Sequence, residues 1–337
     1  MHIALAVALL PAALAAPVAP LYTSDVDSQR ALFEGYKVDF AKSYETPGLE
    51  AKAFFTFVQN LAIIDARNAD DALAEHGLTK YTDMSQAEFE AKLLNYFPPA
   101  MTALEQAARD RNFSASAFET QIDWTGELTT DVKDQGYCGS CWAFSATEQI
   151  ESDALRVLKD ENPDVDYVLA PQQITSCDEH DGGCGGGNTE TAYKYVEEVK
   201  GLMNEKDYAY TSGESGNTGS CKAKAWKEVI GISDWSYVGR SDEKAMSEYI
   251  GSTGPLSICV DASKWNSYKS GVLTNCGSSL DHCVQLVGMD LSASTPYWKV
   301  RNSWGTSWGE DGFIRLEYGK SMCALDNDPT TVVPELA

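Results

Sequence analysis

The chain has 337 residues and a formal net charge of −24, with 50 acidic side chains against 26 basic ones. This negative balance argues against nucleic-acid binding, because the phosphate backbone attracts Lys- and Arg-rich surfaces. The length is comfortable for two or three domains.

The first residues have the pattern of a secretory signal peptide. Residues 3–14 are almost wholly apolar, and Ala13-Leu14-Ala15 offers a small-x-small cleavage site. The apolar run is too short to span a bilayer, and no later stretch is long and apolar enough to do so. We therefore expect a signal peptide at 1–16, no membrane association, and delivery to an oxidising compartment, either a lysosome or vacuole or the extracellular space.

Cysteine placement divides the rest of the chain. None of the nine cysteines precedes residue 138. A cysteine-free part followed by a cysteine-rich part indicates a removable pro-segment and a disulfide-stapled domain. The odd count leaves at least one thiol unpaired if all bonding is internal, and Cys141 is the candidate.

Helical patterns come first along the pro-segment. We predict one helix at 28–40 and a second at 50–73, whose apolar residues recur on one face: Phe54, Phe57, Val58, Leu61 and Ile64. Residues 97–117 are rich in Ala and Pro, and we expect an extended segment there that crosses a cleft and is then cut. Asn112 begins the one acceptor sequon of the chain, which is either glycosylated or unused.

The pattern of the remaining chain changes halfway from helical to strand-like. The pattern of residues 124–169 favours helix, and glycine-rich loops are predicted from there to about residue 210. Short runs rich in Val, Ile and aromatic residues then predict strands at 256–260, 284–287, 297–301 and 313–318. A helical half followed by a β half predicts an α+β fold with a cleft where the halves meet.

The run from Gln135 to Ser145 carries the chemistry. It places Cys141 at the start of a helix that Ser140 can cap, and the positive end of a helix favours the nucleophilic thiolate. A nucleophilic cysteine needs a base, and only His180 and His282 follow it in the chain. His180 lies in a short acidic loop and fits an exposed loop residue better than a base.

These motifs resemble the papain family of cysteine proteases, in cathepsin L-like precursor form. The resemblance rests on Cys-Gly-Ser-Cys-Trp at 138–142, Asp-His-Cys at 281–283 and Asn-Ser-Trp-Gly at 302–305. The helix at 50–73 matches the last four positions of the ERFNIN pattern, although Leu49 and Ala53 replace its Glu and Arg. Residues 77–83 resemble a second propeptide motif.

The resemblance implies a papain-like two-lobed fold, with a helical left lobe, a β-barrel-like right lobe and the cleft between them. It implies an I29-type inhibitory propeptide at 17–117 and a mature peptidase domain at 118–337, beginning near Phe118. Nothing resembles the paired-histidine loop of dipeptidase-type relatives, which favours endopeptidase action.

Roles for five residues follow from the resemblance. Cys141 attacks the peptide carbonyl and forms a thioester, while His282 pairs with the thiolate and later protonates the leaving amine. Asn302 orients the imidazole, and Trp304 shields that hydrogen bond from water. Gln135 and the backbone N–H of Cys141 form the oxyanion hole.

Substrate contacts follow in the same way. Gly186 and Gly187 let an extended peptide approach and pair with the backbone. The Asp281 carbonyl faces the scissile region from the other wall. Asp328 falls at the floor of S2, the pocket for the substrate residue P2, which lies second on the N-terminal side of the scissile bond. A carboxylate there predicts that basic P2 residues are tolerated.

The resemblance also supplies disulfide pairings, which sequence alone does not give. The implied bridges are Cys138–Cys184, Cys177–Cys221 and Cys276–Cys323. Cys259 and Cys283 align with small apolar positions of the S2 wall, and we hypothesise a fourth bridge between them. The alternative is two buried thiols that act as small hydrophobes.

Other functions were weighed against proteolysis. The Cys138–Cys141 spacing also occurs in redox and zinc proteins, but no second such pair and no thioredoxin-like context exists. A non-catalytic relative would lack catalytic residues, and all are present; peptide ligation through the same thioester stays open. We expect no metal or cofactor, a monomer, and as partners peptide substrates, its own propeptide and cystatin-type inhibitors.

Overall fold

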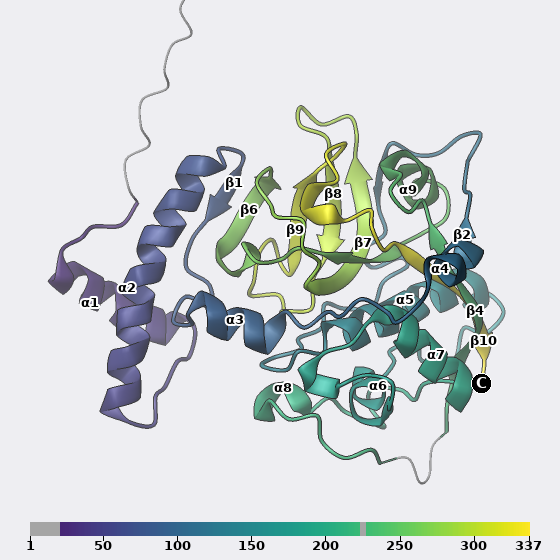
Figure 1. The fold of residues 1–337 in the computed structure, drawn as a ribbon, viewed down its shortest axis with the longest axis horizontal. Coiled ribbons are helices and arrows are strands. Elements are labelled where there is room, and N and C mark those ends of the chain that lie inside the picture. The colour runs from purple at the N-terminus through teal and green to yellow at the C-terminus, as the bar shows by residue number, and fades with distance from the viewer. Residues whose placement is uncertain (1–20, 223–226) are drawn as a thin grey trace, which may run out of the picture.

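The computed structural model describes residues 21–222 and 227–337, so the expected signal peptide at 1–16 lies outside the described residues. Two helices of the pro-segment stand at one end of the molecule, beside a lobe dominated by a sheet (Figure 1). A helical lobe packs below that sheet, and a thin pro-segment strip runs between the two lobes (Figure 1). The α+β class and the two-lobed layout expected from the sequence are confirmed.

The first pro-segment helices match the prediction closely. Helix α1 spans Val26–Asp39 and α2 spans Pro47–Asp70. Helix α2 begins three residues earlier than expected because Thr46 caps it, accepting from the Leu49 N–H, and because proline suits the first helical position. Strand β1 (Ala74–His76) and helix α3 (Gln86–Leu93) complete this part.

An ion pair joins the first two helices where the ERFNIN pattern is broken. Lys37 of α1 bonds to Glu50, the residue next to the mismatched Leu49. Phe33, Tyr36, Phe57 and Leu61 form the buried aromatic and aliphatic core between these helices. The two helices are therefore joined by both apolar burial and charge, from positions shifted by one residue.

The expectation of an extended segment at 97–117 is wrong in part. Residues 103–109 form helix α4 (Ala103–Arg109), and β2 (Asp110–Arg111) follows. The missed signal is a capping box, in which Thr102 accepts from the Glu105 N–H and the Glu105 carboxylate bonds back to Thr102. The segment that does cross the cleft is the earlier one, from Leu93 to Phe97.

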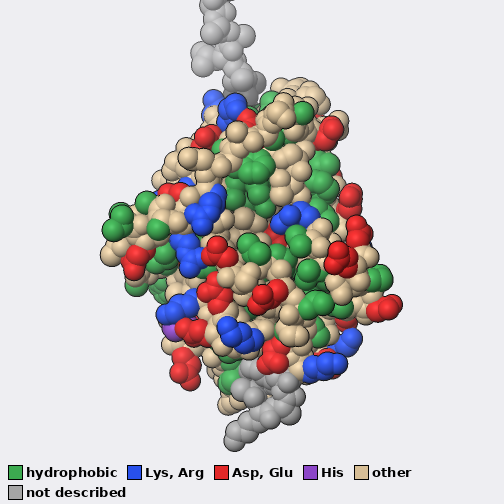
Figure 2. Space-filling view, turned by 90° about the vertical axis from the view of Figure 1, so that its right-hand side faces the viewer, with side chains coloured by type: hydrophobic (Ala, Val, Ile, Leu, Met, Phe, Trp, Pro, Cys, Tyr) green, Lys and Arg blue, Asp and Glu red, His purple; other side chains and the backbone are tan. Residues whose placement is uncertain are grey.

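Ion pairs attach this second half of the pro-segment to the mature part. Arg109 bonds to Asp234, and Arg240 bonds to Asp110. On the face that Figure 2 shows, basic side chains are scattered among acidic ones and form no continuous positive surface.

The helical lobe holds more helix than the sequence suggested. It comprises α5 (Cys141–Leu158), α6 (Pro171–Cys177), α7 (Thr189–Val199) and α8 (Ser212–Ser215). Helix α7 falls inside the stretch expected to be glycine-rich loop. It begins directly after the glycines because Asn188 caps it, accepting from the Thr191 N–H.

The sheet lobe contains the four predicted strands and several others. The strands are β3 (Gln121–Asp123), β4 (Ile230–Val238), β5 (Leu256–Val260), β6 (Tyr268–Leu273), β7 (His282–Asp290), β8 (Tyr297–Arg301), β9 (Phe313–Glu317) and β10 (Thr330–Leu336). Helix α9 (Glu243–Ile250) and the 3-10 turns η1 (Gly183–Gly185), η2 (Trp265–Ser267) and η3 (Met322–Ala324) complete the fold.

The sheet order places pro-segment strands at both ends. The order is β1-β6-β9-β8-β7-β5-β10-β4-β2, and β3 pairs with β7. Strand β1 runs antiparallel to β6, while β2 runs parallel to β4. The pro-segment therefore covers two sheet edges that the mature domain leaves open on its own.

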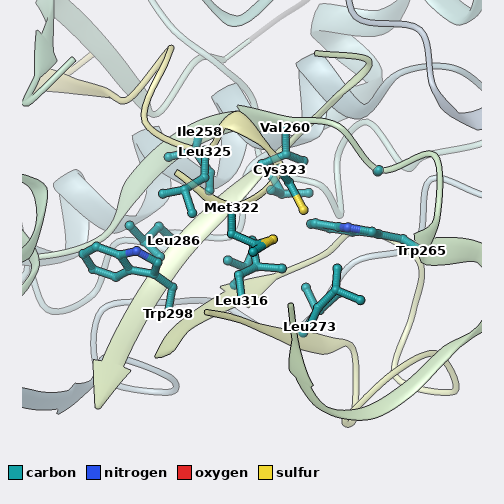
Figure 3. Packing of buried hydrophobic residues seen from close by; sticks show 14 of the residues in the cluster. Ile258, Val260, Trp265, Leu273, Leu286, Trp298, Leu316, Met322, Cys323 and Leu325 are labelled. Atoms are coloured by element: carbon teal, nitrogen blue, oxygen red, sulfur yellow. The ribbon is translucent and has the colours of Figure 1, made fainter. Parts of the chain in front are cut away.

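A dense apolar core fixes the sheet lobe. Trp265, Leu286, Trp298 and Leu316 are buried and converge from β5–β9 and the adjoining turns (Figure 3). The structure has four disulfides, at the pairings expected from the sequence: Cys138–Cys184, Cys177–Cys221, Cys259–Cys283 and Cys276–Cys323. Within the described residues, no helix has the length and apolar character needed to cross a membrane.

Candidate active site

Cys141 lies at the cleft, as the first residue of α5. It is fully buried and is the one free cysteine among the described residues. Trp142 anchors the helix start by donating its Nε1–H to the Gly183 carbonyl at 3.2 Å. Ser140 occupies the N-cap position but makes no side-chain cap, contrary to expectation, because its hydroxyl bonds to Tyr210 at 2.8 Å.

The histidine and asparagine expected beside this cysteine meet on the sheet lobe. His282 opens β7 and Asn302 follows β8, and His282 Nε2 lies 2.8 Å from Asn302 Oδ1. The same oxygen accepts from the Ser303 N–H at 2.8 Å, which fixes it as an acceptor and His282 Nε2 as the donor. His282 Nδ1 is buried without a hydrogen-bond partner among the described residues.

Trp304 covers this pair. Its ring centroid lies 4.8 Å from that of His282. On its other side, the propeptide rings of Tyr81 and Phe89 meet Trp304 edge-on at 5.4 and 5.3 Å. Trp304 therefore excludes water from the His282 side chain and also receives the propeptide.

Gln135 is held rigidly in the cleft. Ser303, a residue that the sequence analysis did not single out, donates its hydroxyl to Gln135 Oε1 at 2.7 Å. Gln135 Nε2 is thereby turned outward, donating to the Cys138 carbonyl at 2.9 Å and the propeptide Leu93 carbonyl at 3.3 Å. The side-chain amide of Gln135, which is expected to stabilise the oxyanion, is thus hydrogen-bonded to a peptide carbonyl of the propeptide in the precursor.

The propeptide runs through the cleft as an extended chain. The Tyr96 N–H donates to the Asp281 carbonyl at 3.0 Å, so that carbonyl faces the extended chain in the cleft. Gly187 pairs on the opposite wall, donating to the Asn95 carbonyl at 3.1 Å and accepting from the Phe97 N–H at 3.0 Å. The bridge between Tyr96 and Gly187 is parallel.

Gly186 allows this close approach. Its φ of 118° lies in a region that side-chain-bearing residues rarely adopt. A Cβ at Gly186 would lie 2.4 Å from the Asn95 carbonyl oxygen. The two glycines therefore have different roles. Gly187 makes the backbone hydrogen bonds to the propeptide, and Gly186 lacks the Cβ that would clash with it.

Tyr96 fills the pocket expected to be S2. Its ring packs against Cys259, Cys283 and Leu280, and its hydroxyl donates to Asp328 Oδ2 at 2.8 Å. Cys259 and Cys283 face each other across β5 and β7 and form a disulfide in the pocket wall. Asp328 is buried and lies at the hydroxyl end of the Tyr96 side chain.

Burial opposes charge on both catalytic groups of the precursor. It raises the pKa of the Cys141 thiol to about 11, against the opposing pull of backbone N–H groups that include that of propeptide Asn95. Burial also lowers the pKa of His282 to about 4, while the bond to Asn302 opposes the shift. Burial in the precursor therefore disfavours the thiolate–imidazolium pair that the resemblance implies for the enzyme.

The competing assignments find no support in this geometry. His180 bonds to Glu198, in the last turn of α7, at 3.0 Å. Cys138 is bonded to Cys184, so the CxxC spacing does not form a redox pair with Cys141. Among the described residues, no cluster of His, Cys, Asp or Glu could hold a metal ion. Asn112 is exposed, as a glycosylated asparagine must be.

Two family models match this chain. Residues 118–333 match the papain family cysteine protease, and residues 33–89 match the cathepsin propeptide inhibitor domain (I29). Cysteine proteinase 2 of Leishmania pifanoi is 38% identical over 335 residues, covering 97% of this chain and 74% of the relative. Cysteine proteinase 15A of Pisum sativum is 35% identical over 318 residues, covering 89% and 85%.

Solved precursor structures are similar over nearly the whole chain. Digestive procathepsin L 3 of the Tenebrio molitor larval midgut superposes with a TM-score of 0.77 at 25% identity, covering 90% of this chain and 99% of that one. The recombinant stem bromelain precursor gives 0.76 at 27% identity, covering 90% and 98%. The chain therefore belongs to the papain family of cysteine proteases, as an endopeptidase precursor that carries its own I29 inhibitor domain.

Proposed function

We propose that the domain at 118–337, once freed from residues 17–117, hydrolyses internal peptide bonds through a thioester on Cys141. The observation that carries this proposal is the Leu93 carbonyl on Gln135 Nε2, because it puts a peptide carbonyl against the amide that the reaction requires. We further propose that the enzyme acts in the secretory pathway, in a lysosome or vacuole or outside the cell, where its disulfides persist.

Departure of the propeptide starts the chemistry. Water then reaches the cleft and lowers the desolvation cost of charging Cys141 and His282. The start of α5 favours the thiolate, and the proton passes to His282 Nδ1, the nitrogen that faces away from Asn302. The bond to Asn302 holds the imidazole plane in place during this transfer.

Acylation and hydrolysis use the same groups twice. Cys141 Sγ attacks the scissile carbonyl, and Gln135 Nε2 with the Cys141 N–H stabilises the oxyanion. His282 gives its proton to the leaving amine as the C–N bond breaks, leaving a thioester. His282 then takes a proton from water, which attacks the thioester, and the thiolate departs as the acid product leaves.

The test is to activate the full precursor at mildly acidic pH and titrate it with an epoxysuccinyl inhibitor, locating the label by mass spectrometry. We expect one label per molecule at Cys141, loss of peptidase activity and a new N-terminus near Phe118. The Cys141→Ala precursor is the control and should neither label nor mature by itself. A folded, processed protein that neither labels nor cleaves peptides would overturn the proposal.

A further inference from the structure

The last part of the propeptide docks on the mature domain at a second place, outside the catalytic cleft. Helix α4 and strand β2 lie against β4, at the end of the molecule opposite α1 and α2 (Figure 1). The match to the inhibitor domain ends at residue 89, so this contact lies outside it. Because the mature domain is expected to begin near Phe118, activation removes α4 and β2 and uncovers the surface beneath them.

Arg109 marks one half of this surface. Its guanidinium lies 4.5 Å from the centroid of the Trp235 ring, and its Nη1 donates to the Trp235 carbonyl at 3.0 Å and to Asp234 Oδ1 at 2.5 Å. Burial raises the pKa of nearby Glu197, and the charge of Arg109 opposes that shift. A ring face beside a carbonyl and carboxylates suits a guanidinium, because the planar cation stacks on the ring and donates to the oxygens.

Arg240, just after β4, marks the other half with the opposite charge. Its guanidinium lies 4.7 Å from the centroid of the Tyr237 ring, and its Nε lies 3.1 Å from Asp110 Oδ1. It also donates to Gln106 Oε1 at 3.1 Å. Activation removes both of these bonds. The mature surface therefore presents an acidic and a basic site that accept consecutive residues, as Arg109 and Asp110 show.

A sheet edge connects the two sites. Asp110 and Arg111 run parallel to β4 and pair with Tyr237 and Val238. Strand β10 lies on the other side of β4, and β2 is the last strand of the sheet, so the departure of β2 leaves this edge open. An open edge accepts an added strand through its backbone groups, and the side-chain sites beside it select the sequence.

The propeptide does not fill this surface. A cavity of about 450 Å³ remains beside α4, lined by Met101 and Arg109 of the propeptide and by Lys194 and Trp235 of the mature domain. The surface therefore has room for a bulkier ligand than the segment that covers it in the precursor.

The propeptide also shows that the surface can be reached from the cleft. The Phe97 N–H is bonded to the Gly187 carbonyl, and the chain runs from there through residues 98–102 into α4. Because Tyr96 occupies the expected S2 pocket, this direction leads away from Cys141 on the side of substrate residues N-terminal to P2. A substrate chain as long as residues 98–108 spans the same interval.

We propose that this surface of the mature domain binds an extended segment of a protein substrate in which arginine is followed by Asp or Glu. The surface consists of the β4 edge and the side chains of Asp234, Trp235 and Arg240. The arginine stacks on Trp235 and bonds to Asp234, the acidic residue pairs with Arg240, and the segment adds to β4 as a strand. This inference rests on the proposed peptidase function and adds a recognition element outside its cleft.

The first test measures binding to the activated enzyme. The full precursor is activated, separated from its propeptide fragments and blocked at Cys141 with the epoxysuccinyl inhibitor, so that the probe is not cut. The probe is a dye-labelled peptide with the sequence of residues 103–112, and fluorescence anisotropy reports its affinity. The control peptide carries Arg109→Ala and Asp110→Ala.

We expect the control peptide to bind about 10-fold or more weakly than the probe. Asp234→Asn enzyme should bind the probe about 5- to 30-fold more weakly than wild type. Glu335→Gln, which neutralises an exposed acidic residue on neighbouring β10, is the matched control and should bind as wild type. Asp234→Lys enzyme should recover affinity for a probe that carries Arg109→Glu, a result that misfolding cannot produce.

The second test measures the effect on cleavage. Two fluorogenic substrates share one cleaved sequence and carry, N-terminal to it through a flexible Gly-Ser linker, either residues 103–112 or the control peptide. We expect the intact extension to lower KM about 10-fold and to leave kcat unchanged, because the second contact raises the effective concentration of substrate at the cleft. Asp234→Asn should remove the difference and cleave a substrate without an extension as wild type does.

Different failures have different meanings. Equal affinity of the probe and the control peptide for wild-type enzyme overturns the inference, even when labelling at Cys141 and cleavage of the short substrate establish the peptidase. Specific binding with equal KM for the two extended substrates overturns the role in substrate recognition. A folded, processed protein that neither labels nor cleaves overturns the proposed function and, with it, that role.

Discussion

The propeptide and the catalytic domain are stabilised in different ways. The catalytic domain holds four disulfides and two extensive buried cores. The described propeptide has no cysteine, and its interior is a small aromatic cluster between α1 and α2. It docks on the catalytic domain through short strands and ion pairs, and through Tyr81, Phe89 and Leu93, which are buried in the sheet-lobe core.

This difference indicates how inhibition can be released without loss of the enzyme. The propeptide contacts Gln135, Trp304 and Asp328, and its polar contacts in the cleft are mainly backbone hydrogen bonds and the Tyr96 hydroxyl. A segment without disulfides can open locally while the disulfide-bonded domain stays intact. Changes confined to the propeptide should therefore affect inhibition and leave the mature domain unchanged.

The largest effect is expected at Asp83, which joins the turn after β1 to α1. Its carboxylate accepts from the Tyr36 and Tyr44 hydroxyls and pairs with Lys42, each at 2.8 Å. Asp83→Ala leaves the largely buried Lys42 charge without a partner, a loss of about 3–5 kcal/mol in the unfolding free energy of the propeptide. Hydrogen exchange of the inactive Cys141→Ala precursor should show faster exchange in α1 and α2.

The mature domain supplies the internal comparison for this measurement. Amides of β7 and β8 should keep their exchange rates, because the disulfides and the sheet-lobe core do not depend on Asp83. Asp39→Ala, an exposed acidic position on α1, is the matched control and should change exchange little. Equal loss of protection in both regions would mean that they unfold as one unit.

A second test uses His76, which is buried where β1 meets the mature domain. Its Nδ1 lies 2.9 Å from Ser267 Oγ. Burial, with the nearby Arg67 and Lys264 charges, lowers its pKa to about 4, and Asp71 opposes the shift. Above pH 6.5 the ring is neutral whether docked or free, so it adds no pH dependence.

Below pH 6.5, His76 is protonated in the free propeptide but stays neutral in the docked propeptide until the pH falls to about 4. Docking is therefore weakened progressively between pH 6.5 and pH 4, by about 3 kcal/mol in all. His76→Asn should remove this part of the pH dependence in hydrogen exchange of the Cys141→Ala precursor. His180→Asn, which alters a partly exposed histidine of the mature domain, is the control and should leave the pH dependence unchanged. Identical slopes for wild type and His76→Asn would exclude His76 as the group responsible.

Sequence reasoning succeeded where a motif ties residue type to position. Cys141, His282 and Asn302 were placed by their local sequence, and the Cys259–Cys283 bridge by its neighbouring strands. It missed features that arise only on folding. Helix α7 follows a glycine run that reads as loop, and Ser303 matters because its hydroxyl meets Gln135, far away in the chain.

The contacts at the expected S2 floor also form only on folding, so local sequence does not predict them. Asp328 was predicted at the S2 floor by counting from a cysteine, and its contact in the precursor is the Tyr96 hydroxyl. The sequence also does not predict that Tyr96 enters the pocket, because the side chains of an extended segment can contact any part of the fold that lies beside it. Tertiary contact, rather than local pattern, decides these positions.

The smallest effect is expected at the surface pair of Lys52 and Glu88, which joins α2 to α3 at 2.5 Å. Lys52 and the capping bonds of Ser85 lower the pKa of Glu88 to about 2. Even so, the two side chains are 64% and 38% exposed, so solvent and salt screen most of their attraction. Lys52→Ala should therefore cost less than about 1 kcal/mol in propeptide stability.

Glu88→Ala should cost more than Lys52→Ala, because it also removes the capping box that Glu88 forms with Ser85, a contribution of about 1 kcal/mol. Added salt should reduce the effect of Lys52→Ala and leave most of the effect of Glu88→Ala. If Lys52→Ala instead destabilised the propeptide as much as Asp83→Ala, exposed charge would stabilise it as strongly as buried charge, and its release would respond to ionic strength as much as to pH.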